Sequence, residues 1–300
     1  MLYIFCMIVL IFPTKYEVIL PGDTTSFQDQ VAIEGYELSD ISSIYVISYE
    51  PITLFQYSIL KAFDLGQVFI PSAATSVMTL REKYDAAQLQ KLSSYTISTI
   101  VAYQQANKEI TYNFKGYAVT SILNANRQIQ VGDYLISING IELTPNIDFT
   151  QFQQELRLNF RIFRDQEIIE VLHERSEKDF GLSLYPIYDI VHTQPMISYP
   201  GLDSLIGGPS GGMMMALSIY LALENQFYDL KIVGTGTVDI HGFIGSIGGL
   251  KEKYMTVKND MDIMFIPSQQ IHELNDIYDS RIVPINHIDD AVKYLKDYHG

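Results

Sequence analysis

The chain has 300 residues, 47% apolar and 18% charged, so it can build a sizeable core and is not a disordered chain. Its 35 acidic residues outnumber 20 Lys and Arg, and the resulting formal net charge of −15 disfavours binding to a nucleic-acid backbone. The single cysteine, Cys6, excludes a disulfide within the chain and a cysteine-rich zinc site.

The chain opens with an uncharged apolar run, Met1 to Phe12, which Pro13 ends. As a helix this run spans roughly 18 Å, less than the ~30 Å hydrocarbon core of a bilayer. Three interpretations compete: a buried strand or helix, a cleaved signal peptide, and a transmembrane anchor that lacks its cytoplasmic end. The signal peptide lacks a basic start and a small-residue cleavage site. We expect the anchor, because a free apolar terminus is otherwise a liability, although no Lys or Arg indicates its orientation.

The next hundred residues combine a predicted linker with predicted helices and a predicted strand. Pro21 to Asp40 is polar and turn-rich and predicts a linker, whereas the alternating pattern of Ser42 to Tyr49 predicts a strand. Thr53 to Phe63 is compatible with a helix. Leu80 to Asn107 has apolar residues at three- and four-residue spacing, and it predicts one long helix or two that meet at a break at Ser93-Ser94.

From Thr111 onward the pattern predicts short strands. Thr111 to Leu123 indicates two strands separated by a glycine break. Tyr134 to Ile138 indicates another strand, flanked by turns at Gly132-Asp133 and Asn139-Gly140. The remaining elements are a helix over Phe149–Leu158 and a hairpin of Leu158–Phe163 with Glu167–His173 around Asp165-Gln166.

The phrase GDYLISING, residues 132–140, resembles the corresponding phrase of PDZ domains, with an ordinary β-hairpin as the alternative. PDZ domains capture an extended peptide as an added strand at a sheet edge. The resemblance implies a carboxylate-binding loop near Lys115 to Ala118 and an accepting strand that contains Tyr117, Ala118 and Val119. The candidate peptide-binding residues are Gly116, Tyr117, Ala118 and Val119. No strong GLGF-like loop is present, so the peptide preference stays open.

A glycine-rich segment, Gly207 to Gly212, precedes Met213 to Leu223, which is apolar on almost every face and predicts a buried helix. Pro209 suits the first helical turn, which places Ser210 there as well. Backbone N–H groups in that turn are unpaired and point outward. A serine hydroxyl beside such donors supplies the nucleophile and the oxyanion hole of acyl transfer. The alternative is that Ser210 only caps the helix.

The segment Val233 to Tyr254 predicts a strand, a hairpin turn at His241-Gly242, a second strand, a glycine turn and the start of a helix. Lys251 and Lys253 lie two residues apart in the first turn of this helix, so their side chains point to different sides. One lysine can therefore face a site while the other is solvated. His241 in the turn and His287 in a later loop are expected to be solvated. An amphipathic helix is expected near the end, where it packs by Ala291, Val292 and Leu295.

These two segments resemble the proteolytic domain of the Lon family of serine proteases, which uses a Ser–Lys pair. The nucleophile motif is matched by residues 208–212, with Gly211 at the place of the common Ala. Gly207 stands where many Lon proteases have Asp, a departure shared by the PDZ-bearing branch. The second motif is matched by Thr235-Gly236 and by the phrase IGGLKEK, residues 247–253. The resemblance covers Pro195 to the C-terminus.

The resemblance implies a role for each matched residue. Ser210 is the nucleophile, Lys253 the general base, and Thr235 the hydrogen-bond partner of that lysine; backbone groups at Gly208 and Pro209 support the oxyanion. Lys251 is expected at the surface. A lysine with its ordinary pKa near 10.4 cannot accept a proton at neutral pH, so Lys253 must be buried without a carboxylate partner. We expect it to be buried against the helix that begins at Met213 to Met215.

The order of the parts resembles the membrane-anchored, PDZ-containing Lon-like proteases of bacteria. The expected fold class is therefore α+β, with the PDZ-like unit inserted into a protease fold that also uses Ile44 to Phe63. The expected divisions are a transmembrane anchor at 1–12, a linker with an N-terminal α/β region at 13–108, a PDZ-like domain at 109–176 and a Lon-like proteolytic domain at 177–300.

The resemblance implies an ATP-independent serine endopeptidase on the outer face of the cell membrane, acting on secreted or membrane-tethered peptides and proteins. No Gly-x-x-x-x-Gly-Lys-Ser/Thr run indicates a nucleotide site, and the six histidines show no HExxH spacing for zinc, so we expect no cofactor. Cys6 falls in the apolar run, which leaves an oxygen nucleophile. The alternative function is an inactive PDZ adaptor on a protease-derived scaffold. The presence of both Ser210 and Lys253 argues against it.

Overall fold

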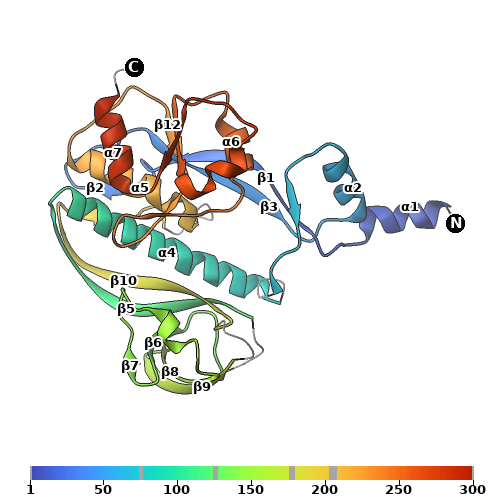
Figure 1. Cartoon of the computed structure of the whole chain (residues 1–300), viewed down its shortest axis with the longest axis horizontal. Helices are drawn as coiled ribbons and strands as arrows, with labels where there is room; N and C mark the ends of the chain where they lie inside the picture. Colours follow the sequence, from blue (N-terminus) through green and yellow to red (C-terminus); the bar gives the residue numbers. More distant parts are fainter. Residues whose placement is uncertain (1, 74–76, 124–127, 176–179, 203–207, 299–300) are drawn as a thin grey trace.

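A computed structural model describes residues 2–73, 77–123, 128–175, 180–202 and 208–298 of the chain. Two six-stranded sheets organise it, and the long helix α4 lies between them (Figure 1). The first sheet has the order β16-β15-β12-β3-β1-β4. Its strands are β1 (Glu17–Ser26), β3 (Ile41–Tyr49), β4 (Gln67–Phe69), β12 (Ile232–Gly234), β15 (Ile263–Pro267) and β16 (Ile282–Ile285).

The first sheet combines strands from the N-terminal and the C-terminal parts of the chain. β3 pairs in parallel with β12 through Ile41–Ser43, and β12, β15 and β16 continue in parallel, whereas β1 pairs with β3 antiparallel. Residues Pro21 to Ser26, which the sequence indicated as part of a linker, belong to β1. The rest of the expected linker contains one short strand, β2 (Ala32–Ile33), which pairs with β11 (Ile197–Ser198).

Both faces of the first sheet are covered by helices. The described α-helices are α1 (Leu2–Ile11), α2 (Leu54–Ala62), α4 (Leu80–Gln105), α5 (Gly212–Leu223), α6 (Leu250–Val257) and α7 (Ile288–Asp297), of which α1 extends away from the sheet (Figure 1). Alternate residues of β15 point to opposite faces: Ile263 and Phe265 join the core of α4, α5 and α7, while Met264 and Ile266 join the core beneath α6. Every residue of α5 is buried, as its apolar sequence predicts, and α7 packs by the expected residues.

Of the two alternatives for the long helical stretch, the structure has the single helix, because α4 runs without interruption from Leu80 to Gln105. Thr79 and Glu82 form a capping box that fixes its start. Ser93 donates a hydrogen bond from its hydroxyl to the carbonyl of Pro186, at 2.7 Å. Ser93 therefore connects the helix to the second sheet, and the serine pair does not break the helix.

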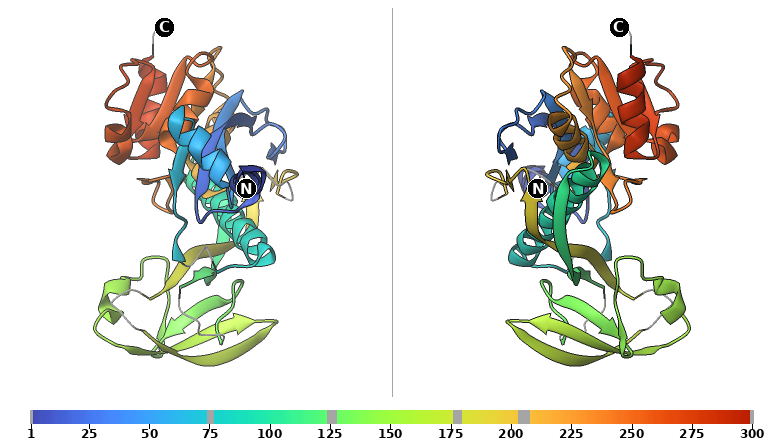
Figure 2. Two further views of the ribbon diagram at one scale, coloured as in Figure 1. Left: turned by 90° about the vertical axis from the view of Figure 1, so that its right-hand side faces the viewer. Right: turned by 90° about the vertical axis from the view of Figure 1, so that its left-hand side faces the viewer.

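The second sheet has the order β10-β5-β6-β8-β9, with β7 at the side of β6. Its strands are β5 (Glu109–Ile122), β6 (Tyr134–Ile138), β7 (Ile141–Glu142), β8 (Arg157–Arg164), β9 (Glu167–Glu174) and β10 (Leu182–Gln194). β10 pairs with β5 along its whole length, so this sheet extends past the boundary expected at residue 176. Figure 2 shows the second sheet below the first, connected to it by α4 and the long strands β5 and β10.

Two further expectations for this region differ from the structure. Gly116 adopts a φ of +120° inside β5, so the expected glycine break is an irregularity within one strand. The helix expected over Phe149–Leu158 is only a 3-10 turn, η1 (Phe149–Phe152), because β8 already begins at Arg157 and Leu158 packs in the core. The hairpin of β8 and β9 and the strand β6 agree with the sequence.

The N-terminal helix α1 extends away from the body beside α2 (Figure 1). It exposes apolar side chains at both of its ends, including Tyr3 and Ile11 and, just after the helix, Phe12. Within the described residues, the helices are either too short or too polar to cross a bilayer.

Candidate active site

A cleft of about 460 Å³ lies between segments from the N-terminal and the C-terminal parts of the chain. One wall is β3 from Ser43, the last residue of this strand that pairs with β12, to Ser48. The opposite side is formed by Ser94 and Tyr95 of α4 and by the turn of Gly208 to Gly211. Lys253 also lines this cleft, so two predicted site residues, Ser210 and Lys253, share it.

Ser210 lies in a short 3-10 turn, η2 (Pro209–Gly211), that leads directly into α5. Pro209 occupies the first position of the turn, as expected, and Gly208 precedes it in an extended conformation. The backbone carbonyl of Ser210 accepts hydrogen bonds from the N–H of Gly236 at 2.8 Å and the hydroxyl of Thr235 at 3.1 Å. The segment after β12 thus fixes the turn that carries the serine.

Lys253 lies on α6, and its side chain is only 2% exposed. Its ammonium nitrogen Nζ is 2.9 Å from Ser210 Oγ and 2.8 Å from Thr235 Oγ1. Lys251, two positions before Lys253 on the same helix turn, is exposed and lies 3.9 Å from Asp64. The two lysine side chains therefore point to different sides, as expected. The structure therefore brings Ser210, Thr235 and Lys253 into one connected set.

Burial alone lowers the pKa of Lys253 from 10.5 to about 7. The hydrogen-bond partners of its Nζ among the described residues are two hydroxyls, which carry no charge to stabilise an ammonium. The adjacent carboxylate, Glu252, lines a separate cavity together with Asp64 and Lys251. The arrangement consequently provides an amine that can lose its proton near neutral pH within hydrogen-bond distance of a serine hydroxyl.

The candidate peptide-binding residues of the second sheet are not at a free strand edge. Tyr117 and Ala118 of β5 pair with β10 on one side and with β6 on the other. The N–H of Val119 donates to the carbonyl of Asp133, and Gly116 precedes these residues within the same strand. The expectation that this strand accepts a peptide is wrong, because both of its edges are already occupied.

The structure also revises smaller expectations near the site. His287 is not simply solvated: it caps α7 and donates from Nε2 to the carbonyl of His241 at 2.8 Å. A Cβ added at Gly211 would lie 3.2 Å from Ser43 Oγ, so this glycine leaves room for β3 beside the nucleophile turn. Gly207 lies outside the described residues. Across the described ranges, no three His, Cys, Asp or Glu side chains gather as a metal site.

Sequence reasoning missed the cleft wall on β3 and the contribution of Ser94. The alternation in Ser42 to Tyr49 indicated a strand, but it did not say that the strand borders the nucleophile. The pairing of β3 with β12 is a contact between distant parts of the chain, and no local pattern encodes such a partner.

A serine hydroxyl paired with a buried lysine in a cleft defines the class of serine peptidases that use a Ser–Lys pair. Residues 202–295 match the family model of the Lon protease (S16) C-terminal proteolytic domain. This segment of the chain therefore matches a Lon-type proteolytic domain, and the match supports a serine peptidase.

Lon proteases of other organisms share sequence with this chain. That of Metamycoplasma arthritidis is 24% identical over 345 aligned positions, which cover 93% of this chain and 40% of the relative. That of Mesomycoplasma hyopneumoniae is 37% identical over 101 residues, covering 33% of this chain and 11% of the relative. That of the Aster yellows witches'-broom phytoplasma is 32% identical over 90 residues, covering 28% and 11% respectively. The chain thus spans well under half the length of these relatives.

Proposed function

We propose that this protein is an ATP-independent serine endopeptidase in which Ser210 is the nucleophile and Lys253 the general base. The observation that carries the proposal is the 2.9 Å contact between Ser210 Oγ and the Nζ of a lysine that is 2% exposed and has only hydroxyl partners among the described residues. A solvated, ion-paired lysine at the same distance would stay protonated and could not accept the serine proton.

The proposed mechanism follows from these contacts. Neutral Lys253 takes the proton of Ser210 Oγ while that oxygen attacks the scissile carbonyl. Backbone N–H groups of the Gly208 to Ser210 turn stabilise the oxyanion, and Thr235 Oγ1 holds the lysine in place. Lys253 then gives the proton to the leaving amine, and water, activated by the same lysine, hydrolyses the acyl-enzyme.

Two finer parts of the proposal concern the other regions of the chain. The second sheet is related to PDZ domains and contributes to substrate binding, through a surface other than β5. The apolar helix α1 attaches the protein to the outer face of the cell membrane, where secreted and membrane-tethered polypeptides are substrates. The exposed apolar residues along this helix support this attachment, as does its position at the far end of the molecule (Figure 1).

The test compares wild type with Ser210→Ala and Lys253→Ala in cleavage of a peptide library, read by mass spectrometry. We expect cleavage by wild type and at least a thousandfold loss in both variants. Lys251→Ala is the matched control, because this lysine is on the same helix turn but at the surface, and it should cleave as wild type does. If the proteins bind peptides but none of the four cleaves them, the result would contradict the proposal and favour an inactive adaptor.

A further inference from the structure

A second cavity, of about 520 Å³, lies on the other side of the nucleophile turn from the first. Pro209 lines this second cavity, and Gly208 and Ser210 line the first. Ser94 of α4 lines both, so the two cavities are neighbours, and the turn that carries Ser210 contributes residues to each. A polypeptide whose scissile bond lies over Ser210 must extend away from it in two directions. The first cavity can hold the part of the peptide on one side of the scissile bond. The second cavity is the space available for the part on the other side.

One wall of the second cavity comes from the second sheet. Leu184, Tyr185 and Pro186 of the outermost strand, β10, line it together with Pro145 of the loop after β7. The hydrogen bond from Ser93 to the carbonyl of Pro186 fixes this strand to α4. The wall is therefore held against the helix that also borders the catalytic serine.

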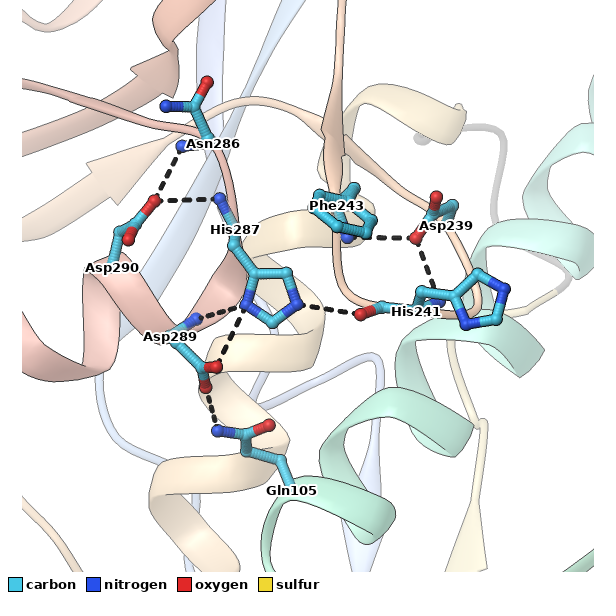
Figure 3. Close-up of polar contacts among 8 residues, drawn as sticks. All are labelled: Gln105, Asp239, His241, Phe243, Asn286, His287, Asp289 and Asp290. Carbon is cyan, nitrogen blue, oxygen red and sulfur yellow. Dashed lines mark hydrogen bonds and ion pairs between the residues drawn. The ribbon is translucent and has the colours of Figure 1, made fainter.

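The opposite wall is the hairpin of β13 (Thr237–Val238) and β14 (Ile244–Gly245), which follows directly on the Thr235-Gly236 segment. Figure 3 shows how its tip is fixed. The N–H groups of His241 and Phe243 both donate to one carboxylate oxygen of Asp239, at 2.9 Å. On the outer side, His287 Nε2 donates to the carbonyl of His241.

His287 is in turn held by the start of α7. Its Nδ1 accepts from the N–H of Asp289, and Gln105 at the end of α4 binds the Asp289 carboxylate (Figure 3). The hairpin wall is thus tied to two helices of the protease core.

The two walls also touch each other. His241 Nε2, on the hairpin, lies 2.8 Å from Asn146 Oδ1, in the loop of the second sheet. Because this hydrogen bond connects the walls directly, the cavity is a bounded site.

The lining of the second cavity is mainly apolar. Ile97, Tyr188 and Val238 form buried parts of it, and Phe243 remains 59% exposed at its edge with its ring against His287. A concave site with several apolar side chains and an exposed aromatic ring at its edge is suited to an apolar side chain of a bound peptide.

We propose that the second cavity is a specificity site for an apolar or aromatic residue of the substrate on one side of the scissile bond. Its two walls are β10 of the second sheet and the β13–β14 hairpin. The second sheet is then part of the active-site cleft itself. This inference rests on the proposed peptidase function, since it assigns a substrate residue to that reaction.

The first experiment profiles cleavage of a peptide library by wild type, Tyr185→Ala and Phe243→Ala. Both variants should lose preference for apolar residues at the same position, on the same side of the cleaved bond, with kcat/KM about tenfold lower for such peptides. Peptides with a small residue there should be cleaved at nearly the wild-type rate. Phe163→Ala, an exposed aromatic of β8 that lines neither cavity, is the matched control and should keep the wild-type profile.

A second experiment measures binding without cleavage, in the Ser210→Ala background. The probes are two fluorescein-labelled nonapeptides that carry one Phe on either the amino or the carboxyl side of a central Ala-Ala bond. One of the two should bind more tightly, and Tyr185→Ala or Phe243→Ala should weaken that peptide alone by about tenfold.

The two experiments separate the possible failures. If wild type cleaves nothing, the peptidase proposal fails and the binding measurement alone decides on the cavity. If wild type cleaves but Tyr185→Ala and Phe243→Ala match Phe163→Ala in both measurements, the cavity proposal is overturned while the peptidase proposal stands. The same conclusion follows if the two wall variants lose preference equally on both sides of the cleaved bond.

Discussion

At the scale of single residues, the environment of Lys253 determines how activity depends on pH. Its pKa of about 7 means that the neutral form becomes the majority only above that pH. We expect kcat/KM to fall about tenfold per pH unit below the pKa and to level off above it. The measurement is a pH profile of kcat/KM on one cleaved peptide. A profile that keeps rising to pH 10 would show that Lys253 has an ordinary pKa.

The same pKa has a consequence for stability. Lys253 loses its proton near pH 7 when folded and near 10.5 when unfolded, so between these values the unfolded chain binds more protons. The free energy of unfolding therefore rises with pH across this window, and the burial cost of the charge is constant below it. Lys253→Met lacks this contribution, and its stability relative to wild type should decline from pH 7 to 10 in urea unfolding. Equal slopes for both proteins would contradict the assignment.

At the scale of elements, the β13–β14 hairpin depends on one glycine. Gly242 has a φ of +87°, and a Cβ at this position would come within 2.6 Å of His287 Nε2. Gly242→Ala should therefore add backbone strain and break the bond from His287 to His241, at a cost of about 2–4 kcal/mol in stability. Urea unfolding gives this value, and library cleavage should show a weaker apolar preference.

Gly132→Ala provides the matched control for the hairpin prediction. Gly132 has a similar φ of +100°, but nothing lies within 4 Å of the added Cβ, so only the backbone strain applies. The difference between the two variants isolates the contact with His287. If both lose the same stability and keep the same cleavage profile, the hairpin does not depend on His287.

Elements with a strong local pattern could be predicted from the sequence, and elements set by distant contacts could not. The buried helix α5, the strand β6 and the β8–β9 hairpin follow from apolar runs, alternation and turn residues. The sequence left open whether α4 is one helix or two, because Ser93 finds an acceptor on β10, which no local pattern reveals. Ser210 and Lys253 could be found because both lie in motifs; Tyr185 and Phe243 could not, since their role depends on which walls face each other.

At the scale of the whole molecule, the protease sheet needs both ends of the chain. β12 has β3 on one side and β15 on the other, and β3 also forms a wall of the catalytic cleft. A fragment of residues 195–300 contains the matched Lon segment but lacks β1 and β3. It would expose the buried faces of α5 and β12, so cooperative folding is not expected from it.

The second sheet, in contrast, is joined to the rest of the chain at one place, and Tyr188 of β10 packs in the core of α4, α5 and α7. Glu109 and Gln194 are partners in the β5–β10 ladder, so the chain enters and leaves this sheet at adjacent points. Replacing residues 109–194 with a short Gly-Ser linker should preserve a cooperative thermal transition and the contact of Ser210 with Lys253, because neither residue touches the removed part.

The shortened protein would lack one wall of the second cavity. It should still cleave peptides with small residues beside the scissile bond, but without the apolar preference of wild type. Calorimetry and library cleavage of the shortened protein and of fragment 195–300 test both statements together. A cooperative transition in the fragment would show that β1 and β3 are dispensable. An unchanged apolar preference in the shortened protein would show that the second sheet does not form part of the active site.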